Sequence, residues 1–339
     1  GWQETRNFLL NYADLPVVPL ATPDGKPLTI SVTLAGRKVS ARILEVRVGR
    51  ISLFLLDTDI DDNNPADRSL TARLYSSDPE VRISQEMLLG IGGVRALRKL
   101  GCSPDLWHMN EGHSAFLTLE RFREYATEGL TFDEILRKVR KSNVFTPHTP
   151  VPAGNDQFPV WMIDKYFPVF WEGLNLTREQ FINLGKQSQS WGDMFSMPVL
   201  ALHLSEHSNG VSELHGEVAR KMWNFLWPDR GEDEVPITSI TNGVHTSFWL
   251  ARRMRQLFDR YFGQDWCERL DDPEIWSRVD QIPDLELWDV RRHLKRKLIN
   301  YAIEQARSHW QSGKRTPAQV IVDGVMLGQY SLTIGFARR

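Results

Sequence analysis

The chain has 339 residues, of which 41% are hydrophobic and 25% charged, and its formal net charge at pH 7 is -2. This composition is typical of a globular protein long enough for two hydrophobic cores, and the near-neutral charge argues against a nucleic-acid partner. The longest apolar runs, such as residues 51–56, are far shorter than the roughly 20 residues that cross a bilayer, and no signal peptide opens the chain. We therefore expect a cytoplasmic protein without a membrane partner. Two cysteines, Cys102 and Cys267, are too few for a disulfide framework or a thiolate zinc site.

Antiparallel strands are the first predicted elements. Between residues 28 and 56, apolar residues alternate with polar ones in three runs, which are separated by Ala35-Gly36-Arg37 and Gly49-Arg50. This alternation predicts three antiparallel strands. Residues 81–100 instead carry apolar residues at helical spacing, and the run stops at Gly101, a residue type that commonly follows a helix.

Strands and helices alternate in the next part of the chain. The pattern predicts strands over residues 106–109 and 144–146 and a helix over residues 114–125. Capping boxes at Thr131 and Thr177 indicate the starts of two further helices. Such alternation predicts an α/β fold with a mostly parallel sheet.

The last third of the chain contains a strong turn signal, Asn242-Gly243, which marks a predicted domain boundary. We place one domain over residues 1–240 and the start of a second over residues 241–339. The predicted elements around this boundary are a helix over residues 209–227, a strand over 237–240, helices over 246–262 and 285–312, and a strand over 332–337. Because the chain lacks an initial methionine and its last strand would need neighbours, we expect an internal piece of a longer protein.

One histidine lies in a stiff loop after a predicted strand. In the segment Phe145-Thr-Pro-His148-Thr149-Pro-Val-Pro-Ala-Gly154, three prolines and a glycine restrict the backbone around His148. Open α/β sheets bind their ligands at the carboxyl ends of their strands. His148 is therefore a candidate ligand-binding residue, of a kind that a sugar site would use well.

A second histidine motif, Trp107-His108-Met-Asn110-Glu111-Gly112-His113, joins a predicted strand to a helix. A carboxylate at Glu111 could orient His113, and Gly112 allows a ligand to approach the backbone. Histidines that cap the helix are one alternative. A bound metal is another, but the motif lacks the histidine spacing of a zinc-protease helix, so we predict no metal.

Two polar motifs complete the set of candidates. Residues 205–211, Ser-Glu-His-Ser-Asn-Gly-Val, are predicted as a polar loop that opens a helix, where free N–H groups could bind hydroxyls or anions. An ordinary helix cap would explain this loop equally well. Residues 241–246, Thr-Asn-Gly-Val-His-Thr, could serve a ligand or form a simple tight turn.

The order of these motifs resembles the α-glucan phosphorylases, the family of glycogen, starch and maltodextrin phosphorylases, and in particular its shorter bacterial and archaeal branch. The resemblance spans most of the chain. It implies a GT-B-type glycosyltransferase fold with two facing Rossmann-like domains, of which the chain would hold most of the N-terminal domain and the start of the C-terminal, cofactor-binding domain. The matching motifs are Asn110-Glu-Gly-His113, His148-Thr149 with its proline loop, Asn209-Gly-Val211 ahead of His215, and Thr241-Asn-Gly243 ahead of Trp249-Leu250.

The resemblance also implies roles for the sugar site. His148 would be the catalytic residue, with its side chain near the 6-hydroxyl of the glucosyl unit and its backbone carbonyl near the anomeric carbon. Thr149 would lie beside it. Asn242 would hold the same hydroxyl from across the domain boundary, and Asn209, Gly210 and Val211 would line the sugar.

Residues at the rim and at the phosphate follow from the same resemblance. Glu111 and His113 would lie at the rim of the site, although the family usually has aspartate in place of Glu111. Arg339 and Arg338 would bind the substrate phosphate. The acidic residues 57–64 occupy the region of a loop that guards the site in the family, and a merely solvated loop is the alternative.

The implied reaction is the phosphorolysis of an α-1,4-glucan by inorganic phosphate, which yields glucose 1-phosphate with retention at the anomeric carbon. The family uses pyridoxal phosphate on a lysine, and that lysine would lie beyond Arg339, so we expect this chain alone to be inactive. A homo-oligomer is compatible with the family.

Two other functions remain open from the sequence. A different GT-B glycosyltransferase, such as a glycogen synthase, would explain the architecture but not the order of the motifs. A non-catalytic carbohydrate-binding module would use the twelve tryptophans as stacking platforms. Most of these tryptophans, including Trp223, Trp227, Trp249 and Trp310, fall in predicted helices at core positions, which weighs against the module.

Overall fold

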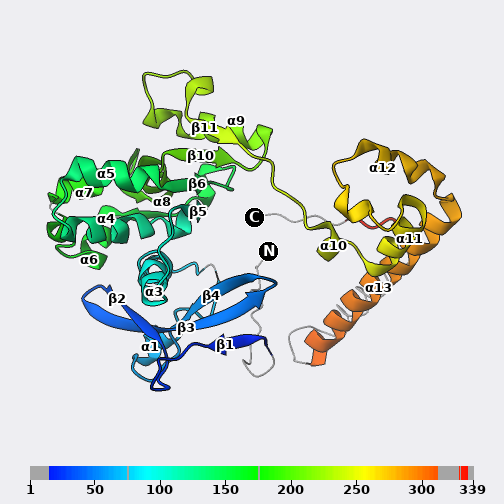
Figure 1. The fold of residues 1–339 in the computed structure, drawn as a ribbon, viewed down its shortest axis with the longest axis horizontal. Helices are drawn as coiled ribbons and strands as arrows, with labels where there is room; N and C mark the ends of the chain where they lie inside the picture. The colour runs from blue at the N-terminus through cyan, green and yellow to red at the C-terminus, as the bar shows by residue number, and fades with distance from the viewer. Residues whose placement is uncertain (1–14, 75, 175, 312–327, 329, 335–339) are drawn as a thin grey trace. The chain divides into compact units, whose positions relative to one another are not determined.

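The computed structural model describes residues 15–74, 76–174, 176–311, 328 and 330–334 (Figure 1). The chain divides into two compact units, and the division falls between Asn242 and Gly243, close to the predicted boundary after residue 240. The assignment of these units to a glucan-phosphorylase domain and a cofactor domain stays a prediction. Every helix in the described residues is too short or too polar to cross a bilayer.

The first unit begins with an antiparallel sheet built around one long strand. Strand β3 (Arg37–Val48) pairs with β1 (Val17–Pro19) and β2 (Thr29–Leu34) along one side and with β4 (Ile51–Asp57) along the other. The three strands predicted over residues 28–56 are thereby confirmed. Alternate side chains of β2 and β3 enter the core, including Val32, Leu34, Val39 and Ile43.

The helix predicted over residues 81–100 forms with an irregular middle. It consists of α2 (Pro79–Met87), a π-helical turn η2 (Leu88–Gly92) and α3 (Gly93–Lys99), and Gly101 follows with a positive φ of 74°, as predicted. A Cβ on Gly90 would lie 2.6 Å from the backbone nitrogen of Leu117. Only glycine fits at this position. The π-helical turn thus contains the point at which this segment packs closely against the start of helix α4 (Leu117–Thr127).

A four-stranded parallel sheet forms the centre of the first unit. Its strands are β5 (Trp107–Asn110), β6 (Asn143–Thr146), β10 (His207–Gly210) and β11 (Ile237–Ser239), and they lie side by side in the order β11, β10, β6, β5 (Figure 1). The predicted parallel α/β arrangement is confirmed. The predicted loop over residues 205–211 is wrong, because residues 207–210 pair with strands on both sides; the following helix α9 begins only at Glu213 and ends at Trp223.

Helices and a small second sheet surround the parallel sheet. Helix α9 packs on β10 and β11, and α5 (Phe132–Lys141) packs on β6. The capping boxes predicted at Thr131 and Thr177 are confirmed at the starts of α5 and of α7 (Arg178–Asn183). An antiparallel sheet of β7 (Gln157–Pro159), β8 (Lys186–Gln189) and β9 (Gly192–Ser196) was not predicted. The remaining helices of the unit are α1 (Pro65–Arg68), α6 (Val160–Tyr166) and α8 (Met197–His203).

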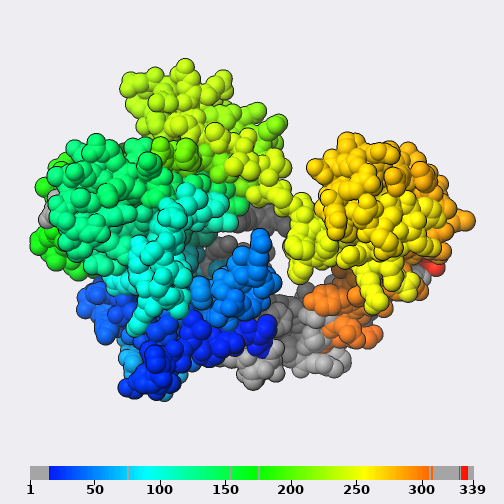
Figure 2. All heavy atoms as spheres, viewed as in Figure 1, coloured from blue at the N-terminus to red at the C-terminus, as the bar shows by residue number. Residues whose placement is uncertain are grey.

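The second unit is helical in its described part. It comprises α10 (Thr246–Trp249), α11 (Arg252–Phe262), α12 (Pro273–Ser277) and α13 (Asp284–Gln311). A core of Met254, Leu257, Phe262, Trp266, Ile275 and Ile282 holds α11 and α12 together, and Figure 2 shows these segments as one packed body.

Three predictions for the second unit need correction. The single helix over residues 246–262 is interrupted, because Leu250 and Ala251 have extended backbones. Trp249 is 75% exposed rather than in the core, whereas Trp223 of the first unit is buried as predicted. Leu332 to Ile334 do not form a strand, since they find no partner strand among the described residues; the rest of that prediction, together with Arg338 and Arg339, lies outside the described residues.

Candidate functional site

The four parallel strands end at one edge of the sheet, and each predicted motif follows one of these ends. Glu111 follows β5, His148 follows β6, Val211 follows β10 and Asn242 follows β11. The register pairs Asn110 with Thr146 and Gly210 with Ser239, so the carboxyl ends lie next to one another. This is the edge at which open α/β sheets bind ligands.

The carboxylate of Glu111 connects the end of β5 to the loop after β6. Its Oε2 accepts hydrogen bonds from the backbone N–H of His148 and the hydroxyl of Thr149, both at 2.9 Å. Its Oε1 accepts the N–H of Gly112 at 3.3 Å. Glu111 therefore contacts the His148 loop and not His113, so the sequence-based suggestion that it orients His113 is wrong.

The backbone of Glu111 is strained. Its φ of 67° and ψ of 169° lie in a region that is almost restricted to glycine. Such a conformation costs on the order of 1–3 kcal/mol and persists only where surrounding contacts fix it. Here the N–H of Glu111 donates to the carbonyl of Thr146 at 2.9 Å, and its side chain makes the contacts to the loop.

A chain of hydrogen bonds runs across β5, β6 and β10 at this edge. His108 Nε2 lies 2.8 Å from Thr146 Oγ1, and Thr146 Oγ1 donates to Asn209 Oδ1 at 3.0 Å. The amide of Asn209 then donates to the carbonyl of Gly210 at 3.2 Å. Asn209 and Thr146 are both buried. The Asn209 side chain thus fixes the strand ends from within the sheet.

The segment after β10 is fixed by a histidine whose contact was not predicted. His215 Nδ1 accepts the N–H of Val211 at 3.1 Å, so its other ring nitrogen carries the hydrogen when the ring is neutral. The carbonyl of Val211 accepts the N–H of Asn242 at 3.1 Å. Gly210 has no room for a side chain, because a Cβ would lie 2.7 Å from the nitrogen of Gly216. These contacts bring Val211 and Asn242 together.

The ring of His148 is half-buried and differs at its two nitrogens. Its Nε2 is buried and has no hydrogen-bond partner among the described residues. Its Nδ1 makes no hydrogen bond within the described part of the chain, and the residue as a whole is partly exposed. Nδ1 is therefore the ring nitrogen that a ligand hydroxyl can reach.

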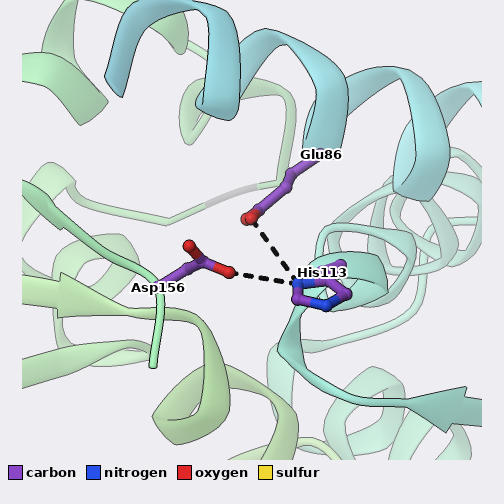
Figure 3. Close-up of side chains that lie close together, drawn as sticks. All are labelled: Glu86, His113 and Asp156. Atoms are coloured by element: carbon purple, nitrogen blue, oxygen red, sulfur yellow. Dashed lines mark hydrogen bonds and ion pairs between the residues drawn. The ribbon is translucent and has the colours of Figure 1, made fainter. Parts of the chain in front are cut away.

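His113 lies in a separate cluster of charged groups (Figure 3). Its Nδ1 is 3.0 Å from Asp156 Oδ2 and 3.9 Å from Glu86 Oε1. Arg82 lies in the same cluster, with its guanidinium 2.7 Å from Asp156 Oδ2, 2.9 Å from Glu86 Oε1 and 2.6 Å from His113 Nδ1. The contact between Arg82 and Glu86 lacks hydrogen-bond alignment, because neither Glu86 oxygen has a hydrogen-bond partner among the described residues. Arg82 and His113 precede Asp156 by 74 and 43 residues, so sequence analysis did not bring them together.

The two carboxylates of this cluster have opposite pKa shifts. Burial raises the pKa of Glu86 well above its usual range, the negative charge of Asp156 raises it further, and Arg82 opposes both. Burial also acts to raise the pKa of Asp156, but hydrogen bonds from His113 and Arg82 outweigh it, so that this pKa lies well below its usual range. Asp156 is therefore the ionised partner, and Glu86 holds its proton to higher pH.

The cluster does not suit a metal ion, although ligand atoms of Glu86, His113 and Asp156 lie within 4.8 Å of one another. The guanidinium of Arg82 already supplies the positive charge between the two carboxylates. A metal ion would have to take the place of the guanidinium between the carboxylates, and the positive charge of Arg82 nearby would repel it.

The edge motifs contain no lysine. Each lysine of the described residues is exposed or half-exposed, and none follows the carboxyl end of a parallel strand. We therefore assign none of these described lysines to pyridoxal phosphate.

Comparison with known proteins identifies the family. The sequence model of the carbohydrate phosphorylases matches residues 102–314. The chain is 42% identical over 330 residues to maltodextrin phosphorylase of Thermococcus litoralis, with 97% of this chain and 38% of the relative covered. It is 40% identical over 352 residues to glycogen phosphorylase of Mycobacterium tuberculosis, with 100% of this chain and 40% of the relative covered.

A third relative, glycogen phosphorylase of Aquifex aeolicus, is 34% identical over 339 residues, with 100% of this chain and 49% of the relative covered. The chain thus spans less than half the length of these relatives. Since the family model covers more than half of the chain, and since it includes the motifs after β5, β6, β10 and β11, the chain belongs to the carbohydrate phosphorylase family.

Proposed function

We propose that this chain forms the glucosyl-binding part of an α-1,4-glucan phosphorylase. The enzyme would transfer the terminal glucosyl unit of glycogen, starch or maltodextrin to inorganic phosphate, with retention, and release glucose 1-phosphate. The observation that carries the proposal is the convergence of four motifs at the carboxyl edge of one parallel sheet. Relatives named maltodextrin and glycogen phosphorylase support it.

His148 is the proposed catalytic residue. Its accessible Nδ1 can hydrogen-bond the 6-hydroxyl of the sugar, and its carbonyl lies on the loop that Glu111 holds in place. A carbonyl dipole beside the anomeric carbon would stabilise the positive charge that develops when the glycosidic bond breaks. The side chain of His148 would position the sugar ring, and its backbone carbonyl would stabilise the positive charge at the anomeric carbon.

The remaining residues of the edge complete the proposed sugar site. Asn242 is exposed, and its backbone is tied to Val211, which leaves its side-chain amide available to a hydroxyl. The division of the chain falls directly after Asn242, so this residue lies at the end of the first unit and would hold the hydroxyl from there. Thr149, Asn209, Gly210 and Val211 would line the sugar, and His113 with Glu111 would lie at the rim.

The complete enzyme would have a GT-B fold with two facing Rossmann-like domains and would act in the cytoplasm. Arg338 and Arg339 would bind phosphate. Pyridoxal phosphate, attached to a lysine outside this chain, would supply an acid/base phosphate group to the reaction. The described residues would bind and orient the glucan end.

An assay of the full-length protein that carries these residues tests the proposal. With maltodextrin, inorganic phosphate and pyridoxal phosphate, we expect glucose 1-phosphate to form, and we expect it to disappear when phosphate is omitted. Transfer from a nucleotide sugar without phosphate-dependent release would instead identify a glycogen synthase-like enzyme. Glucan binding without either reaction would identify a binding module.

A further inference from the structure

We infer that Glu111 is a positioning residue, which holds the backbone of His148 and Thr149 in the conformation that the reaction needs. The inference rests on the proposed function for its catalytic consequence. The contact that it describes is present in the chain itself.

The carboxylate of Glu111 is arranged as an acceptor for the loop after β6. Two of its three hydrogen bonds come from consecutive residues of that loop, the N–H of His148 and the hydroxyl of Thr149, and both reach the same oxygen at 2.9 Å. The third comes from Gly112. Glu111 is only 9% exposed, so water does not readily replace these bonds.

The backbone conformation of Glu111 serves the same contact. With φ at 67° the chain turns sharply after β5, and the Glu111 side chain points back to the loop after the neighbouring strand. The turn leads directly into Gly112, where a Cβ would lie 3.2 Å from Met197 and Pro198. A glutamate in a conformation that favours glycine indicates that the side chain, and not the ease of the turn, determines the residue at this position.

Glu111 is not arranged for other chemistry. Its contacts are with donors, it lies outside the cluster of Glu86, His113 and Asp156, and it makes no hydrogen bond to a histidine ring among the described residues. Its effect on the sugar would therefore pass through the position of His148. Small displacements of a positioning group reduce turnover strongly while binding changes less.

Three variants separate this role from a general role in folding. Glu111→Gly removes the acceptor and also relieves the strained backbone, so it should fold. Glu111→Gln keeps one oxygen acceptor and should give an intermediate result. Glu128→Gln is the matched control, because Glu128 is exposed and follows α4, away from the strand ends.

Amide hydrogen exchange in the 339-residue chain tests the contact. The His148 amide should exchange at least tenfold faster in Glu111→Gly and less so in Glu111→Gln, with the Glu128→Gln rate unchanged. In the full-length protein, Glu111→Gly should lower kcat about 30- to 100-fold and change the KM for maltodextrin less than threefold.

Two results would overturn the inference. One is an unchanged His148 exchange rate in both variants; the other is faster exchange with an unchanged kcat. If the wild-type protein shows no phosphorolysis, the proposed function fails on its own, and the exchange rates still decide whether Glu111 holds the loop.

Discussion

Thr146 connects two parallel strands through its side chain, because its Oγ1 donates a hydrogen bond to Asn209 Oδ1 at 3.0 Å. The hydroxyl has one hydrogen, so the contact from His108 Nε2 at 2.8 Å must be one in which the histidine donates. The three side chains therefore form a hydrogen-bond chain with a single direction. This series of hydrogen bonds determines that Nε2 of His108 carries a hydrogen, and it determines the orientation of the Asn209 amide.

Replacing Thr146 with valine should destabilise the first unit by about 1–3 kcal/mol, because the buried Asn209 oxygen loses its donor while the shape of the side chain is kept. Thr146→Ser keeps the hydroxyl and should cost less. Urea unfolding of the 339-residue chain measures both. Equal stabilities of the valine and serine variants would show that the hydrogen bond contributes nothing.

Glu86→Gln should stabilise the chain at neutral pH. Because burial raises the pKa of Glu86 in the folded state above the unfolded value of about 4.3, the folded state binds more protons between these values and stability falls as pH rises. The Glu86→Gln variant has no carboxyl group at this position, so it does not lose this stability as the pH rises. Urea unfolding at pH 4 and pH 8 should therefore give a gain that is small at pH 4 and larger at pH 8. A variant less stable than wild type at pH 8 would show that the ion pair with Arg82 outweighs burial.

Asp156→Asn should have the opposite pH dependence. The pKa of Asp156 is lowered in the folded state, so its contribution is present above the unfolded value of about 3.9 and is lost as pH falls through the folded value. At pH 7 we expect a loss of about 1–3 kcal/mol, since the hydrogen bonds to His113 and Arg82 are weakened. The difference from wild type should shrink steadily below pH 4. A difference that stays constant down to pH 2 would contradict the lowered pKa.

Asn242 and His148 are expected to contact the same sugar hydroxyl. In the synthetic direction, the full-length Asn242→Ala enzyme should use glucose 1-phosphate at least tenfold less efficiently than wild type, because a hydrogen bond to a bound hydroxyl is lost. With 6-deoxyglucose 1-phosphate, wild type and variant should be equally efficient, because this substrate lacks the hydroxyl that Asn242 would contact. A variant that loses the same factor on both substrates would place Asn242 elsewhere.

Much of the parallel fold was predictable because its signals are local. The helix over residues 81–100 and the capping boxes at Thr131 and Thr177 appear in the periodicity and in short motifs. The π-helical turn at Gly90 was not predictable, since it depends on the approach of Leu117 from another helix. Strand β10 was missed for a similar reason: its polar residues 207–210 become a strand only by pairing with β6 and β11.

The site was predicted as a set of motifs but not as a set of contacts. His148 and Asn242 were predicted as site residues from their loops and from family resemblance, and their roles stay predictions. The contact between Glu111 and His148 was not predicted. It depends on the positive φ of Glu111, and the sequence has no glycine at this position to indicate one. Arg82 and Asp156 were missed because the contact joins residues far apart in the sequence whose charges alone are typical of surface residues.

The central claim is that the edge at His148 binds the glucosyl unit that reacts, and the most direct test is the rate of glucose 1-phosphate release by three forms of the full-length protein. We expect wild type to be active and His148→Ala to be slower by on the order of a hundredfold, the scale for removing a group that positions the reacting sugar. His207→Ala is the matched control, because His207 is an exposed histidine at the amino end of β10, and it should stay within twofold of wild type. A His148→Ala enzyme as active as the His207→Ala enzyme would contradict the claim.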